Sequence, residues 1–99
     1  MYYILDKDKN PVQATLEQFA KFCEQQGDKV VQQDKLPNGT FVSTVFLGLD
    51  HQFGDGPPIL FETMIFGGEH DQYQERYCTW TEAVKGHRKA LSLIDNITP

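Results

Sequence analysis

The sequence predicts a single α+β domain over residues 1–99, in which a mostly antiparallel sheet of four to five strands carries two helices on one face. Three observations lead to this prediction. Two apolar runs, 42–49 and 59–66, suit neighbouring strands. An Asn38-Gly39 pair ahead of them is typical of a tight hairpin turn. Two capping boxes, each followed by apolar residues at helical spacing, mark the helices. The predicted element order is β-α-β-β-β-β-α.

The N-terminal part is predicted to hold a strand, a helix and a second strand. Residues 2–5 form a short strand, and residues 29–33 form a moderately polar one. Thr15 and Gln18 make the first capping box, so the helix begins there, and Gly27 is expected to end it. Apolar side chains at i, i+3, i+4 and i+7 predict one buried stripe on this helix. The stripe consists of Leu16, Phe19, Ala20 and Cys23.

The C-terminal part is predicted to hold three hairpin-linked strands and a closing helix. The strands cover about residues 40–48, 59–66 and 74–78. The second capping box spans residues 79–82, and the helix that follows extends to about Ile94. Its inner face is expected to carry Ala83, Val84, His87, Ala90, Leu91 and Ile94.

Composition and charge narrow the classes of function. The net charge is −5 and the Lys and Arg residues are scattered, so we expect no nucleic-acid partner. No apolar run approaches the roughly 20 residues that span a bilayer, and Met1–Leu5 is followed at once by charged residues, so we expect no membrane segment and no signal peptide. Cys23 and Cys78 lack C-x-x-C spacing, which favours two buried, reduced thiols. A soluble cytoplasmic protein is the expectation.

Polar side chains that suit binding or catalysis gather in two loops and one strand. A few carboxylates and imidazoles at one end of an antiparallel sheet would suit a divalent metal. The fixed short spacings of known metal motifs are missing, however, so solvated acidic loops are the alternative, and we assign no metal, no cofactor and no catalytic residue. The residues concerned are Asp50, His51 and Asp55 in the first loop, Glu69, His70 and Asp71 in the second, and Glu62 in the strand between them.

Glu62, Gly86 and Trp80 each allow a structural and a functional interpretation. Glu62 lies within an apolar strand. If it is buried for structural reasons, it needs a partner such as Arg76; the alternative is a functional carboxylate in a binding site. Gly86 lies inside the last predicted helix, where glycine costs roughly 1 kcal/mol against alanine. Either the helix packs closely on the sheet there, or a partner lies against Gly86 and His87. Trp80 fits a recognition surface or the rim of the core.

The two most apolar strands predict that both faces of the sheet need a cover. Two helices on one side bury only one pleat face. Leaving three or four large apolar side chains in water forgoes roughly 1.5–3 kcal/mol each, comparable to the net stability of a small domain. Either the long loops fold over the second face, or another protein chain does, as a homodimer or a hetero-partner.

Two segments carry a resemblance to a known family. Residues 43–68 read STVFLGLDHxFGxGPPxLFETMxFGG, and residues 76–87 read RYxTWxEAxxGH. In these segments the chain resembles a family of small uncharacterised proteins encoded by bacteriophages and prophages. The resemblance implies a virus-encoded accessory protein that works in the bacterial host cytosol, and it transfers no catalytic residue. Many small acidic phage proteins occupy a surface on a host enzyme, antiviral defence systems included.

The sequence therefore favours a non-enzymatic phage accessory protein that acts by protein–protein binding, against a host defence or regulatory protein or against a second copy of itself. A small metal- or ligand-binding enzyme with a polar site at the loop end of the sheet, and a minor virion component, are the alternatives. The candidate partner-binding residues are Asp50, His51, Phe53, Asp55, Glu62, Glu69, His70, Trp80, Gly86 and His87.

Overall fold

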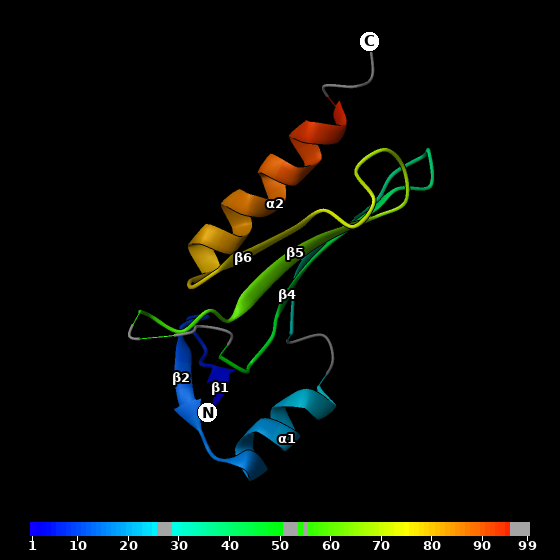
Figure 1. Cartoon of the computed structure of the whole chain (residues 1–99). Helices are drawn as coiled ribbons and strands as arrows, with labels where there is room; N and C mark the ends of the chain where they lie inside the picture. Colours follow the sequence, from blue (N-terminus) through cyan, green and yellow to red (C-terminus); the bar gives the residue numbers. More distant parts are fainter. Residues whose placement is uncertain (26–28, 51–53, 55, 96–99) are drawn as a thin grey trace.

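A computed structural model describes residues 1–25, 29–50, 54 and 56–95, and it confirms the α+β class (Figure 1). Among these residues two helices and six strands occur, in two antiparallel sheets. The elements are β1 (Tyr2–Leu5), β2 (Pro11–Ala14), α1 (Leu16–Glu24), β3 (Val30–Lys35), β4 (Phe41–Phe46), β5 (Phe61–Phe66), β6 (Gln74–Tyr77) and α2 (Trp80–Asp95).

The main sheet has four strands in the order β3-β4-β5-β6, which is their order along the chain. The predicted Asn-Gly turn joins β3 to β4: Gly39 has a φ of 89°, and the Asn38 side chain accepts a hydrogen bond of 3.0 Å from the Thr40 backbone N–H. β4 and β5 pair in register from Phe41 opposite Phe66 to Phe46 opposite Phe61. The two most apolar strands are thus the central pair.

Helix α2 covers one face of this sheet (Figure 1). It begins at the predicted capping box, in which the Thr79 hydroxyl accepts from the Glu82 N–H at 3.1 Å and the Glu82 carboxylate accepts from the Thr79 N–H at 3.1 Å. Alternation along β4 and β5 points every second side chain at this helix. The buried residues beneath and along it are Val42, Thr44, Phe46, Phe61, Thr63, Ile65, Ala83, His87, Ala90 and Ile94.

Helix α1 packs mainly against a separate hairpin of β1 and β2. The sequence reading missed β2, because Pro11 and Gln13 look like turn and surface residues in a strand of four. Phe22 reaches the core of the main sheet, its ring meeting that of Phe46 edge-on at 5.7 Å. Both helices therefore contribute to the core on that side, but only α2 runs along the sheet.

The predicted stripe of α1 is partly wrong. Phe19 and Cys23 face inward and are half-buried, whereas Leu16 is 59% exposed and Ala20 is exposed. The two-stranded hairpin is too narrow to cover a broad helix face. The helix therefore contacts the rest of the protein mainly through the rings of Phe19 and Phe22. Phe19 lies on Tyr2 at 5.1 Å and against Gly48. The helix ends at Glu24, and Gly27, its predicted end, lies outside the described residues.

Candidate functional site: the open face of the sheet

Among the described residues, no helix crosses the face of the main sheet opposite α2, and we call this face the open face. Strand register places its side chains in three rows. Two rows run from β3 to β6 and the third from β3 to β5, and they alternate with the positions that point at α2. They are Val30–Val45–Glu62–Arg76, Gln33–Ser43–Met64–Gln74 and Lys35–Phe41–Phe66.

An apolar stripe runs down the middle of the open face. Phe66 is 44% exposed, and its ring stacks on that of Phe41 with 6.2 Å between the centroids. Met64 and Val45 are half-buried, in contrast with the fully buried Phe61 and Ile65 on the other side of the same sheet. A contiguous apolar patch with a polar rim is typical of protein contact surfaces.

Polar side chains border this stripe on β3 and β6, and they interrupt it at Ser43 of β4 and Glu62 of β5. The Glu62 carboxylate accepts from Arg76 Nε at 2.9 Å and from Gln74 Nε2 at 2.5 Å. On the β3 side, Gln33 Nε2 donates to the Ser43 hydroxyl at 3.0 Å. The predicted pairing of Glu62 with Arg76 is therefore confirmed, and it leaves Glu62 without need of a further ligand.

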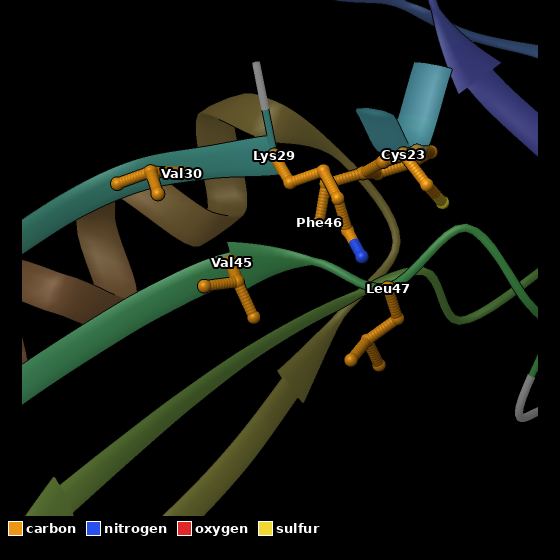
Figure 2. Close-up of a pocket in the computed structure, with 6 residues that line it drawn as sticks. All are labelled: Cys23, Lys29, Val30, Val45, Phe46 and Leu47. Carbon is orange, nitrogen blue, oxygen red and sulfur yellow. The ribbon is translucent and has the colours of Figure 1, made fainter. Parts of the chain in front are cut away.

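At one end the open face leads into a hollow of about 380 Å³ between α1, β3 and β4 (Figure 2). Figure 2 shows the Lys29 side chain extending from the start of β3 toward Leu47, with the Cys23 thiol at the end of α1 on the other side. The lining is mostly apolar and carries one ammonium group and one thiol. It consists of Cys23, Lys29, Val30, Val45, Phe46 and Leu47.

A buried polar network lies on the covered face. His87, fully buried on α2, lies with Nε2 2.7 Å from the Asp34 carboxylate and with Nδ1 2.7 Å from the Thr44 hydroxyl. Thr44 in turn lies 2.5 Å from the Thr63 hydroxyl. The hydrogen bond from His87, and then that from Gln32, hold the pKa of Asp34 below its usual value, against an opposing effect of burial.

The order carboxylate, imidazole, hydroxyl also occurs in nucleophilic catalysis, but the environment here argues for a structural role. Thr44, Thr63 and His87 have no exposed surface, so no substrate reaches the hydroxyl groups. The network instead satisfies polar groups that the helix buries. Sequence reasoning missed it because its members lie far apart along the chain and carry no shared motif.

Three of the predicted partner-binding residues lie in or beside the core. Gly86 packs against the β6 side chain Tyr77, and a Cβ at Gly86 would overlap the Tyr77 ring and hydroxyl. Close packing of helix on sheet, the structural interpretation of Gly86, is thus what the structure shows. His87 is buried beneath the helix, and Trp80 meets Phe61 edge-on at 6.3 Å. These positions are removed from the candidate surface.

The two acidic loops lie at opposite ends of β5 (Figure 1), so the expectation that they meet at one end of the sheet is wrong. A six-residue strand separates them by about 20 Å. Asp50 accepts from the Ile59 N–H at 3.0 Å, and Asp71 from the Gly67 N–H at 2.7 Å, so both shape their own loops. Glu69 is exposed and His70 half-buried. The predicted residues His51, Phe53 and Asp55 lie outside the described part of the chain.

Both cysteines are free, as predicted, but they are half-buried rather than buried. Each lies at the end of an element beside a loop, where packing is incomplete. Burial, helped by the nearby Glu82 and Asp50 carboxylates, raises the pKa of the Cys78 thiol. A raised pKa disfavours the thiolate, which is the nucleophilic form, so the surroundings of Cys78 do not activate it as a nucleophile.

In the described ranges no three His, Cys, Asp or Glu side chains gather closely enough to hold a metal ion. No helix there combines the length and the apolarity needed to cross a bilayer. In comparisons with known proteins, no family model, no curated protein and no solved structure matches the chain. The open face is therefore the feature that best supports a function.

Proposed function

We propose that this protein is a phage-encoded accessory protein that acts by binding another protein, a host defence or regulatory protein of the bacterial cytosol, through the open face. The phage origin rests on the resemblance of residues 43–68 and 76–87. The binding role rests on one observation: a small sheet presents aromatic and aliphatic side chains on a face that no described element covers.

The free energy of burying apolar side chains favours a complex in which a partner covers the open face. Fully burying a Phe, Met or Val side chain contributes roughly 1.5–3 kcal/mol, and the isolated chain forgoes part of this at each of the apolar positions. Phe66, Met64 and Phe41 lie within one patch, so a single partner surface covers them together. The ion pair of Glu62 and Arg76 at the edge gives the patch a polar rim, as protein interfaces have.

Affinity capture from bacterial lysates tests the proposal with three immobilised proteins. The wild type is compared with Met64→Gln/Phe66→Gln, which removes apolar area from the open face, and with Leu16→Gln. The last is the control, since Leu16 is an apolar side chain on α1 that is more exposed than Phe66 or Met64. We expect one stoichiometric host protein on the wild type and on the control, and its loss from the double variant.

Two results would contradict the proposal. One is an equal yield of the same host protein on all three columns, which would place the contact elsewhere. The other is a stable dimer by size-exclusion chromatography with light scattering that the Met64→Gln/Phe66→Gln change abolishes, with no host protein captured. That outcome would assign the face to a second copy of this chain.

A further inference from the structure

We propose that the open face takes an acidic protein segment bearing apolar side chains, held by Lys29 and Lys35 and anchored in the hollow at the end of the sheet. This inference rests on the proposed function and specifies the chemistry of the partner. Its basis is a local reversal of charge. The whole chain carries −5, yet the described residues of the open face and its hollow present three cations and one carboxylate.

The two lysines are the cations that remain available to a partner. Arg76 is already paired with Glu62 at 2.9 Å. Lys29 and Lys35 have no ion-pair partner among the residues that the structure describes. Asp34, the carboxylate next to Lys35, points to the other side of the sheet, where it binds His87. The β3 edge of the open face is therefore basic, and it complements an acidic partner.

The spacing of the two lysines suits an extended segment along the sheet. Lys35 is the last residue of β3 and Lys29 directly precedes its first residue, Val30, so the two are separated by at most about 20 Å at the usual rise of a strand. Between them run the polar Gln33 and, one strand inward, the apolar Val45 and Phe41. An extended segment with acidic side chains near its two ends and apolar side chains at alternate positions between them would place carboxylates at the lysines and apolar groups on the stripe.

The hollow provides the anchoring point. Its volume of about 380 Å³ lies in the range of about 300–1,000 Å³ found for small-molecule sites. One large apolar side chain fits such a space, with Val30, Val45 and Leu47 around it and the Lys29 ammonium at its side. A few side chains that fill well-packed, desolvated pockets, aromatic ones above all, carry most of the binding energy of protein interfaces.

Two other occupants fit the charges less well. In a two-fold dimer through the open face, each basic β3 edge would meet a second face of the same charge. On the described part of the open face, a nucleic acid would meet two lysines besides the paired Arg76, too few for a phosphate-tracking surface on a chain of net charge −5. An acidic protein segment satisfies both the lysines and the apolar stripe.

The test uses a fluorescein-labelled twelve-residue peptide with Glu residues at each end and alternating Leu and Ser between them, and a matched peptide in which every Glu is Lys. Fluorescence anisotropy at low and high salt measures binding to the wild type and to Lys29→Glu/Lys35→Glu. The control is Lys85→Glu/Lys89→Glu, which reverses two exposed charges on the outer side of α2. We expect the acidic peptide to bind the wild type and the control at least tenfold more tightly than it binds the open-face variant, with loss of affinity in high salt.

Alkylation of the two cysteines locates the bound peptide. Cys23 lines the hollow, whereas Cys78 lies beyond β6, near Pro57. The acidic peptide should slow iodoacetamide labelling of Cys23 and leave that of Cys78 unchanged. Equal binding of the Lys peptide, displacement of the acidic peptide by oligo(dT), or unaltered Cys23 labelling would overturn the inference.

The capture experiment separates this inference from the proposed function. If Lys29→Glu/Lys35→Glu retains the host protein while Met64→Gln/Phe66→Gln loses it, the face binds protein but not through an acidic segment. If both variants retain the host protein, the proposed function itself fails. Circular dichroism of each variant checks that its fold is unchanged.

Discussion

The two faces of the four-stranded sheet share the same strands but differ in what covers them. On one face α2 excludes water from Phe46, Phe61 and Ile65, which have no exposed surface. On the other, Phe66 is 44% exposed and Met64 is half-buried. The comparison shows that both faces carry apolar side chains but that the described residues supply a helical cover for one face, which is why we propose a partner for the other.

Polar groups differ between the two faces in the same way. On the covered face Thr44, Thr63 and His87 are buried and bind one another, with Asp34 at the more exposed end of the network. On the open face Glu62 and Arg76 pair at a rim that water reaches. Buried polar groups must be satisfied within the fold, whereas rim groups remain available to a partner.

The largest expected effect on stability comes from truncating a buried side chain on the covered face of the sheet. Phe61→Ala should lower the free energy of unfolding by about 3–5 kcal/mol, because it leaves a cavity beside Phe46 and Trp80. Phe66→Ala on the open face should cost less than about 1 kcal/mol. Urea denaturation followed by circular dichroism measures both. Similar losses for the two variants would mean that the faces are equally covered.

The next effect concerns the contact between α2 and β6. Gly86→Ala improves helix propensity but drives a methyl group into Tyr77, so we expect a net loss of about 1–3 kcal/mol. In a Tyr77→Ala background the same change should become neutral or stabilising. A double-mutant cycle by urea denaturation measures the coupling, and additive effects would place the Tyr77 ring elsewhere.

The buried network predicts a dependence of stability on pH. Since the pKa of Asp34 is lowered in the folded state, its contribution is present above about pH 4, the usual pKa of an aspartate, and is lost as the pH falls through the lowered value. Asp34→Asn should therefore be less stable than the wild type at pH 7, and the difference should shrink toward pH 2. In a His87→Gln background the difference should be smaller at every pH. A difference that is constant from pH 7 to pH 2 would contradict the network.

The smallest effect is expected at the rim of the open face. Glu62→Gln breaks the ion pair with Arg76, which is 41% exposed, so we expect a loss below about 1 kcal/mol that disappears in high salt. Urea midpoints at low and high salt measure it. A larger loss that persists in salt would mean that this rim is buried in the free protein.

The fold class and most of the main sheet could be predicted because local signals carry them. Asn38-Gly39, the two capping boxes and the apolar alternation of β4 and β5 all lie within short segments, and each appears where the sequence placed it. The hairpin strand β2 could not be found, because a four-residue strand that begins with proline gives no clear alternation of apolar and polar side chains.

The site was harder to predict, since it depends on which side of the sheet each helix takes. The pairing of Glu62 with Arg76 followed from charge and strand order. The second cover, which stays a prediction, followed from apolarity on both pleat faces. His87 was assigned to a partner because the sequence does not show that Asp34 and Thr44 lie beside it. The separation of the two acidic loops could likewise not be predicted, because it depends on β5 running between them.

Oxidation of the two methionines tests the central claim most directly. Met64 lies in the middle of the open face, whereas Met1 is 71% exposed at the N-terminus and acts as an internal control. Hydrogen peroxide is applied to the free protein and to its complex with the captured host protein, and mass spectrometry follows each sulfoxide. We predict that the complex slows oxidation of Met64 severalfold and leaves Met1 unchanged. Equal oxidation of Met64 in the free and bound states would contradict the assignment of the open face to a partner.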